Sequence, residues 1–420
     1  MRIESSLAPA QRATSRNVIR LSIVFAAAYF FSTNGLASLP GITVNFLLKD
    51  VLHMTATQAS YFGAITIIGW ALKPIWGFIS DYFPIFGFRR RSYLIIASLL
   101  SATIWAILAN IHQYSIQSLI TLFTLSSIAY AFMDVLVDAL MVETGKPLGL
   151  TGRFQSIQWT AVYIASIIAG ALGGWVAAHL APQETFAINA VFPIIILVII
   201  ALWAREEKIA ATADNRRETK NAFKTAFKNR QLWFLGFFLF FWTFSPSFGT
   251  PFFYYSVDTL KFDPLFFGTV AAFAAAASAV GAILYGKYYR RINTRALIRF
   301  AIFLGVISTI FPLIYFLPAI KENLPFAKNL YLYSNMLLSV IGAITFLVML
   351  NAAAIACPKR SEGVVFATLT ACWNIGLIGS SAIGGFLFEK IGLVPLILVS
   401  AIFTALTWLI LPHLKFGDEL

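Results

Sequence analysis

The chain has 420 residues, of which 59% are hydrophobic and 12% are charged, with a mean hydropathy of +0.79 and a formal net charge of +13. Soluble domains are about half apolar and about a quarter charged, so this composition excludes an ordinary soluble protein. The apolar runs are close to the ~20 residues that a membrane-spanning helix needs, and the short alternating segments of membrane-spanning strands do not occur. We therefore predict an all-α membrane protein.

Twelve apolar runs, taken in chain order, predict twelve transmembrane helices. The predicted spans are residues 20–47, 57–81, 92–110, 117–142, 154–180, 185–204, 231–256, 264–287, 296–318, 329–356, 362–388 and 391–413. No compact apolar region with a small-residue cleavage site precedes them, so we expect no removable signal peptide.

Basic residues gather on one side of these spans. With both termini in the cytoplasm, most of the 31 Lys and Arg fall in inner segments, and the outer loops hold only Lys49, Lys261, Lys321, Lys328 and Lys390. This asymmetry follows the positive-inside rule. The positive net charge therefore belongs to loops that lie beside anionic lipid, so no nucleic-acid partner is expected.

A polar stretch over residues 205–230 divides the chain into two six-helix halves, 1–204 and 231–420. Phe223 and Phe227 within it favour an interfacial amphipathic helix, and a solvated linker fits equally well. The halves echo each other, because a Gly and a dense basic cluster follow both the second span (residues 77–91) and the eighth (residues 281–295). Parallel six-helix repeats are the organisation of major facilitator transporters.

The segment after span 2 resembles the signature of that superfamily through Gly77, Asp81, Gly87, Arg89 and Arg90. Its longer form resembles the folate–biopterin transporter (BT1) family, and further matches follow in family order. They are KPIWGFISDYFPIFGFRRRSYL (73–94), DVLVDALMVE (134–143), GRFQSIQW (152–159), PSFGTPFFYYSVDTLKFDPLFFG (246–268) and CPKRSEGVVFATLTACWNIG (357–376). The resemblance implies the major facilitator fold with twelve helices, and movement of folates or pterins across a membrane. Another small organic anion or aromatic solute is the alternative substrate.

Charged residues inside the spans support this fold independently. Spans 3, 6, 9 and 12 have no ionisable residue in their interiors, as expected for the lipid-facing helices of the fold. Lys73, Asp134 and Asp138 lie within spans, where a charge is costly and usually faces a cavity or a partner. At 1.5 Å per residue, Lys73 and Asp134 are both about 12–13 Å from the inner end, and Asp134 and Asp138 share one helix face.

Three interpretations of these charges fit, and they do not exclude one another. In the first, Lys73 forms a structural ion pair with one Asp. In the second, an Asp accepts hydrogen bonds from the pterin edge, while Lys73 or Arg153 binds the substrate carboxylates. In the third, Asp134 or Asp138 carries a proton and couples transport to it.

Polar and aromatic residues on two other spans are further candidates for the cavity. Arg153, Gln155, Gln158 and Trp159 open span 5, where helix–helix hydrogen bonding explains the glutamines almost as well. On span 11, Trp373 with Asn374 could stack on a flat ring, although a packing Trp is the commoner case.

Gating candidates lie at the inner ends of the spans. In the first half they are Asp81, Arg89, Arg90, Arg91 and Glu143, for which a topology signal alone is the alternative; in the second half they are Arg290, Arg291 and Glu362. Pro246, Gly249 and Pro251 predict a break in span 7.

Enzyme chemistry is not expected. The four His residues are far apart, no metal-ligand spacing, nucleophile–base pair or phosphate loop occurs, and no cofactor is implied. We expect a monomeric secondary transporter, in a bacterial plasma membrane or alternatively a plastid envelope. The other class is a membrane receptor, which would bind the ligand without moving it.

Overall fold

The protein is seen in a computed structural model that describes residues 9–32, 34–204, 230–288, 294–355 and 362–410, with isolated positions between 206 and 228. Ten helical segments in these ranges are long and apolar enough to cross a membrane, and two shorter apolar helices occupy predicted spans 1 and 7. A multi-pass helical membrane protein is thus confirmed.

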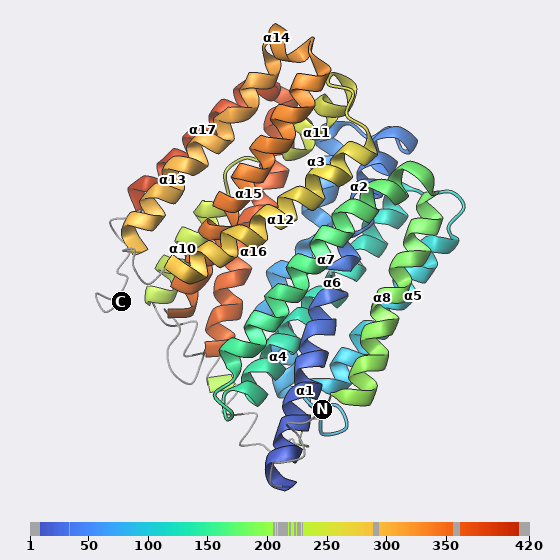
Figure 1. The fold of residues 1–420 in the computed structure, drawn as a ribbon, viewed down its shortest axis with the longest axis vertical. Helices are drawn as coiled ribbons and strands as arrows, with labels where there is room; N and C mark the ends of the chain where they lie inside the picture. Colours follow the sequence, from blue (N-terminus) through green and yellow to red (C-terminus); the bar gives the residue numbers. More distant parts are fainter. Residues whose placement is uncertain are drawn as a thin grey trace.

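The N-terminal half (blue to green in Figure 1) lies beside the C-terminal half (yellow to red). Its elements are α1 (Pro9–Phe30), η2 (Leu36–Ser38), α2 (Gly41–Phe46), η3 (Leu47–Val51), α3 (Ala56–Thr66), η4 (Ile68–Leu72), α4 (Lys73–Tyr82), α5 (Arg91–Asn110), α6 (Ile116–Gly145), α7 (Thr151–His179) and α8 (Pro182–Trp203). Those of the C-terminal half are α10 (Arg230–Thr243), α11 (Gly249–Asp258), α12 (Pro264–Tyr288), α13 (Thr294–Ile310), η6 (Phe311–Phe316), α14 (Pro318–Lys321), α15 (Leu324–Ile355), α16 (Glu362–Ile391) and α17 (Leu393–Ile410).

The first predicted span, residues 20–47, is not one continuous helix. Helix α1 ends at Phe30, and α2 begins only at Gly41. Pro40 is the N-cap residue of α2, where its missing backbone N–H costs no helical hydrogen bond. A side chain at Gly35 would lie 2.2 Å from the Phe30 carbonyl oxygen, so only glycine allows the chain to fold back this closely.

The predicted break in span 7 is confirmed between Thr243 and Gly249. The backbone N–H of Ser247 donates to the Ser380 carbonyl on α16 over 2.9 Å, and the Ser380 hydroxyl donates to the Ser245 carbonyl. Non-helical backbone at membrane depth is tolerated where neighbouring protein supplies such partners. Span 2 also changes form midway, because the 3₁₀ turn η4 separates α3 from α4.

The helices expected to face lipid form the two edges of the molecule. Helices α5 and α8 pack together at one edge and α13 and α17 at the other (Figure 1). Large apolar side chains on these edges are exposed, among them Leu99, Leu202, Phe303 and Leu409.

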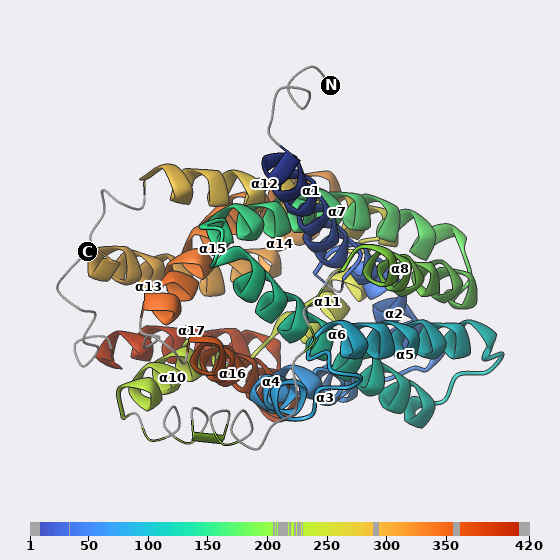
Figure 2. The same cartoon turned by 90° about the horizontal axis from the view of Figure 1, so that it is seen from below.

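The halves meet along α7 and α12, with a second contact between α16 and the α3–η4–α4 segment. Seen along the helices, α7 and α12 lie side by side on one flank of the molecule (Figure 2). A side chain at Gly174 would lie 2.6 Å from the Gly268 Cα, so glycines let these two backbones touch. We call the end of the bundle with Arg89, Arg90 and Arg91 the basic end, and the end with Lys49 and Asp258 the opposite end.

Candidate functional site

A cavity of about 350 Å³, which we call the central cavity, lies between the two halves. It is within the range of roughly 300–1,000 Å³ that small-molecule sites occupy. Its lining comprises Tyr29, Asn34, Ile67, Trp70, Lys73, Asp134, Asp138, Gln155, Gln158, Trp159, Leu239, Phe346, Met349, Leu350, Leu369, Thr370, Trp373, Asn374 and Leu377. The predicted cavity residues of spans 2, 4, 5 and 11, except Arg153, therefore meet in one place.

Lys73 and Asp134 form an ion pair in this cavity. Lys73 is the first residue of α4, and its Nζ lies 2.7 Å from Asp134 Oδ2 on α6; the two side chains are 13% and 12% exposed. The Lys73 Nζ also lies 4.8 Å from the centre of the Trp70 ring, within the range of a cation–π contact. Lys73 therefore has an anionic partner and an aromatic one inside the protein.

Asp138 has a different environment one turn along α6. Its Oδ1 accepts a hydrogen bond of 2.6 Å from the Tyr29 hydroxyl on α1, and within the described ranges it has no cation within ion-pair distance. The two carboxylates thus share a helix face but differ in their closest partner. Asp134 is neutralised by a lysine, whereas Asp138 is held by a neutral phenol.

Helix α7 contributes Gln155, Gln158 and Trp159 to the lining. Gln158 is 2% exposed, and its Nε2 makes no hydrogen bond to the rest of the described protein. Arg153, which begins the same helix, is exposed and is not among the lining residues. It lies toward the basic end, two residues before Gln155.

An aromatic row crosses the cavity from one half to the other. The Phe346 ring centre lies 5.6 Å from that of Trp159 and 5.7 Å from that of Trp373, with edge-on geometry in both pairs. Asn374 Nδ2 donates to the Trp70 carbonyl over 3.1 Å, which is a second link between the halves. These rings offer flat apolar surface beside the charged residues.

At the basic end, two carboxylates surround Arg90. Its Nη2 lies 2.5 Å from Asp81 Oδ1 and 2.8 Å from Glu143 Oε1, and its side chain is 5% exposed. Burial lowers the pKa of the Arg90 guanidinium, but the charges and hydrogen bonds of Asp81 and Glu143 outweigh burial, so that the pKa is raised. Arg89 contacts the same two acids at 3.7 and 3.3 Å.

Of the remaining gating candidates, only Arg91 has a described side chain, and it bonds outside this cluster. Arg91 donates to the Ala201 carbonyl. Arg290, Arg291 and the Glu362 side chain fall outside the described residues, as does most of the 205–230 segment. Glu206 within that segment accepts hydrogen bonds from the backbone N–H groups of Arg89, Arg90 and Arg91, at distances of 2.8 to 3.1 Å. A carboxylate there complements the positive N-terminal end of α5.

The opposite end is closed by contacts between the halves. Lys49 lies 2.6 Å from Asp258 and 3.2 Å from Asp50. The Tyr254 hydroxyl donates to the Met54 carbonyl over 2.9 Å, and the Ser381 hydroxyl donates to the Ser60 carbonyl over 2.9 Å. The described structure therefore joins its halves at the end away from Arg90.

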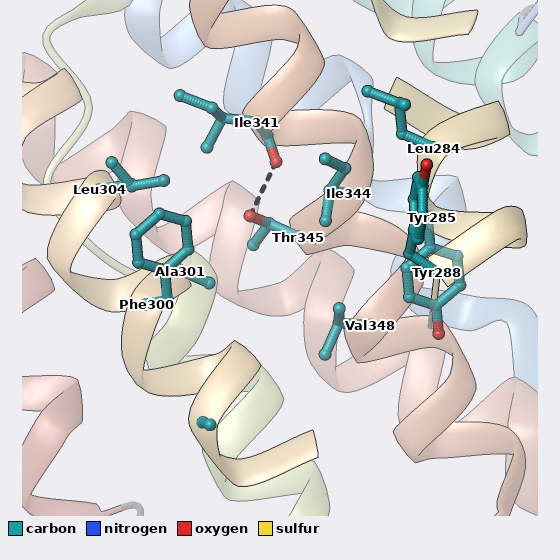
Figure 3. Close-up of a pocket in the computed structure, with 11 residues that line it drawn as sticks. Leu284, Tyr285, Tyr288, Phe300, Ala301, Leu304, Ile341, Ile344, Thr345 and Val348 are labelled. Carbon is teal, nitrogen blue, oxygen red and sulfur yellow. Dashed lines mark hydrogen bonds between the residues drawn. The ribbon is translucent and has the colours of Figure 1, made fainter. Parts of the chain in front are cut away.

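A larger apolar groove of about 510 Å³ lies between α12, α13 and α15 (Figure 3). Its walls include Leu284, Phe300 and Ile344, and the described residues that line it include no Asp, Glu, Lys, Arg or His. The Thr345 hydroxyl is already bound to the Ile341 carbonyl on its own helix. This groove offers no fixed charge to a polar solute, so we place the functional site in the central cavity.

Tyr29, Trp70 and Phe346 also line the central cavity, but they were not predicted from the sequence. An aromatic residue in an apolar span has no pattern that separates a cavity wall from ordinary packing. Their roles follow only from what lies opposite them: Asp138, Lys73 and the two tryptophans. No group of three possible metal-ligating His, Cys, Asp or Glu side chains occurs among the described residues.

Comparison with known proteins gives a family and a set of relatives. The model of the BT1 family matches residues 34–414. The chain is 29% identical over 371 residues to the folate-biopterin transporter of Synechocystis sp., covering 86% of this chain and 74% of that protein. It is 27% identical over 363 residues to folate transporter 2 of Plasmodium falciparum, covering 84% and 78%.

Solved structures share the fold at low sequence identity. The crystal structure of a D-xylose-proton symporter aligns with a TM-score of 0.71 and 14% identity, covering 96% of this chain and 98% of that one. The crystal structure of a mutant of the nucleoside transporter NupG aligns with a TM-score of 0.68 and 13% identity, covering 94% of this chain and 98% of that one. The predicted major facilitator fold is confirmed by these alignments.

Proposed function

This chain belongs to the BT1 family, and we propose that it moves folates or pterins across a membrane by alternating access around the central cavity. The relatives are named as folate or folate-biopterin transporters, which suggests the substrate class. The residues that line the central cavity include groups suited to such a substrate. A pterin presents a flat ring and an edge with parallel N–H donors. The aromatic row and the carboxylates of this cavity match those two features.

The observation that carries the proposal is the unequal pairing of the two aspartates. Among the described residues, Asp134 is held by Lys73, whereas the hydrogen-bond partner of Asp138 is the Tyr29 hydroxyl. A carboxylate can accept two parallel hydrogen bonds. Asp138 is therefore the residue that receives the 2-amino group and ring N–H of the pterin, with Trp159 and Trp373 beside the ring.

The glutamate tail of a folate carries carboxylates that need cations or water. Since Lys73 is already paired inside the cavity, the exposed Arg153 is the better partner for the tail. Arg153 lies about 3 Å nearer the basic end than Gln155, and its long exposed side chain is the one proposed to reach a tail that leaves the cavity at that end. In this proposal the pterin lies inward and the tail lies toward the basic end.

Proton coupling is a second function that one observation favours. Asp138 is the cavity carboxylate without a cation, so it can bind and release a proton without breaking the Lys73 pair. The Arg90 cluster and the Lys49 pair then stabilise the two ends of the bundle during the cycle.

In the membrane, the basic end faces the cytoplasm, since Lys and Arg favour that side. The divisions at 1–204, 205–230 and 231–420 are the two moving halves and their linker. A single chain encloses the central cavity, so the working unit is a monomer, and a bacterial plasma membrane is the proposed location.

The test is uptake of labelled folate and labelled pterin into proteoliposomes at two pH values. Asp138→Asn keeps the size of the side chain and removes its second acceptor. We expect it to lower uptake of both solutes by at least tenfold and to abolish any pH dependence. Asp134→Asn should also reduce uptake, but by leaving Lys73 unpaired rather than by removing a contact to the pterin. Glu322→Gln, at an exposed carboxylate of the opposite end, is the matched control.

Accumulation of neither solute by the wild type, together with binding of both, would point to a receptor and overturn transport. Normal uptake by Asp138→Asn would overturn its role while leaving transport in place.

A further inference from the structure

The apolar groove of Figure 3 opens to the outside of the bundle. Two residues on its walls, Tyr288 of α12 and Phe300 of α13, are 40% and 57% exposed. We propose that this groove binds one acyl chain of an anionic phospholipid, and that Lys287 and Arg299 bind the phosphate of its headgroup. This ligand comes from the bilayer around the protein, so its binding does not depend on which solute the central cavity takes.

Helix α15 separates the groove from the central cavity. Its Ile341 and Thr345 line the groove, whereas its Phe346 and Leu350 line the central cavity. At about 3.6 residues per turn, these two pairs lie on roughly opposite faces of the helix. The groove therefore faces the bilayer, and a ligand in it stays out of the solute path.

A close contact between α12 and α15 ends the groove on its deep side. A side chain at Gly281 would lie 2.5 Å from the Val340 carbonyl oxygen, so the two backbones touch there. The groove begins one turn closer to the basic end, at Leu284. Along α13 its lining runs from Leu304 to Ala296, which is about 12 Å at the rise of an α-helix. One leaflet has about 15 Å of hydrocarbon, so an acyl chain of that leaflet can lie along the whole groove.

The walls of the groove are apolar along this length. They comprise Ala, Leu, Ile, Val and Phe side chains, two tyrosines and Thr345, whose hydroxyl is already bound to its own helix. A polar solute would lose its hydration there without gaining partners. An acyl chain has no polar group to satisfy, and it makes van der Waals contact with such walls along its length. The groove thus favours a hydrocarbon chain over a polar ligand.

Positive charge gathers where the groove reaches the basic end. Residues 287–299 contain five basic residues and no Asp or Glu; the five are Lys287, Arg290, Arg291, Arg295 and Arg299. The structure describes two of these side chains, Lys287 and Arg299, and both are exposed. Neither forms an ion pair with a carboxylate of the described residues. These two cations are therefore available to an external anion.

Arg299 faces lipid close to the basic end of α13. It lies in the second turn of this edge helix, immediately before the exposed Phe300. A cation that faces hydrocarbon is costly, so long basic side chains extend toward the lipid headgroups. Helical side chains also lean toward the N-terminal end of their helix, which for α13 is the basic end. The Arg299 guanidinium is thus directed to the level of the phosphates.

Lys287 supplies a second cation on the helix that forms another wall of the groove. It lies in the last turn of α12, and its Nζ is 5.4 Å from the centre of the Tyr288 ring. Two cations favour a headgroup of net negative charge, and a guanidinium binds phosphate through paired hydrogen bonds. Phosphatidylcholine carries a cation of its own, which these residues repel. We therefore expect an anionic phospholipid to be preferred.

The experiment counts the lipids bound to the purified full chain in detergent by native mass spectrometry. The probes are dioleoyl phosphatidylglycerol and dioleoyl phosphatidylcholine. Because basic residues at the surface attract anionic lipid, we expect the wild type to bind phosphatidylglycerol at least about tenfold more tightly than phosphatidylcholine. In Lys287→Gln/Arg299→Gln this preference should fall to about twofold or less. Lys261→Gln/Lys321→Gln removes the same charge from two exposed lysines at the opposite end and should keep the preference.

The groove is tested separately from the cations. Ala296→Trp places a ring in the groove and leaves both cations unchanged, so it should weaken phosphatidylglycerol binding at least about fivefold. Dihexanoyl phosphatidylglycerol has the same headgroup on short chains, and it should bind the wild type at least about tenfold more weakly than the dioleoyl lipid. This second measurement tests the same point if Ala296→Trp does not fold.

Equal affinity of the wild type for the two dioleoyl lipids, or an unchanged preference in Lys287→Gln/Arg299→Gln, would overturn the proposal. Equal binding of the dihexanoyl and dioleoyl forms of phosphatidylglycerol would overturn it too, since it would show an ion site with no chain in the groove. Thermal unfolding without added lipid gives a further check. Exposed residues without an ion pair contribute little to stability, so Lys287→Gln/Arg299→Gln should have the Tm of the wild type. A fall of several degrees would show that the two residues hold the fold together rather than a lipid.

Discussion

Lys73 Nζ lies 2.7 Å from Asp134 Oδ2, and this ion pair joins the middle of span 2 to the middle of span 4. Removing one partner of a buried pair leaves the other charge without compensation, which costs more than removing both. The pair therefore explains why two charges can lie in spans that are otherwise apolar.

We predict that Lys73→Met destabilises the protein by roughly 3 kcal/mol, the lower end for a buried pair because both residues border a cavity. Lys73→Met/Asp134→Asn should recover most of this loss. Thermal unfolding of the three proteins in one detergent measures the difference. Equal Tm values for the single and double variants would show that the two residues are not coupled.

At the basic end, Arg90 and Arg89 contact the same acids but differ in burial. Arg90 is 5% exposed, whereas Arg89 is 28% exposed. Arg90→Met leaves Asp81 and Glu143 facing each other without a buried cation, so we expect Tm to fall by about 5 °C or more. Arg89→Met is the control and should lower Tm by much less, because partly exposed pairs contribute about 0–1 kcal/mol. A larger fall in Tm for Arg89→Met than for Arg90→Met would contradict the conclusion that Arg90 is the more important cation of this cluster.

The Lys49–Asp258 pair joins the two halves at the opposite end. Burial lowers the pKa of Lys49, but hydrogen bonds to Asp258 and Asp50 outweigh it, so the pKa is raised and the cation is kept. Asp258→Asn should shift the population toward states open at this end. Since Asp258 is 61% exposed, the ratio of open to closed states at this end should rise by at most about fivefold.

Maleimide labelling of Ser381→Cys, in a background of Cys357→Ser/Cys372→Ser, measures that opening. Ser381 donates to the Ser60 carbonyl across the closed contact, so its reactivity should rise when the contact separates. Lys328→Gln is the matched control, because it breaks an ion pair with Asp263 inside the C-terminal half. Equal labelling rates in wild type and Asp258→Asn would refute a closing role for this pair.

Asp263 predicts a pH effect outside the membrane spans. Burial raises the pKa of its carboxyl, but hydrogen bonds from Lys328 and from the Phe266 backbone outweigh burial, so the pKa is lowered. A lowered native pKa adds stability above the unfolded value of about 3.9, and this stability is lost as the pH falls through the native pKa. The Tm difference between wild type and Asp263→Asn should be constant above about pH 5 and shrink below about pH 4. A difference that grows on acidification would contradict this sign.

Much of the architecture follows from the sequence by itself. The lengths of the apolar runs predict the membrane class, the Pro and Gly residues near 246–251 predict the break in span 7, and uncharged spans predict the two lipid-facing edges. These features depend on local chemistry, because a bilayer imposes the same apolar length on every span. The depth of Lys73 and Asp134 is also local, since it follows from the rise per residue.

The partners of those charges were decided only by the tertiary structure. Depth places Lys73 level with Asp134, but the rotation and lateral position of α4, α6 and α1 determine that Asp134 meets Lys73 and that Asp138 meets Tyr29. The break after Phe30 likewise depends on how closely the chain folds back at Gly35. Hydropathy reports how deep a residue lies, whereas helix packing determines what it faces, because packing depends on side chains that are distant in the sequence.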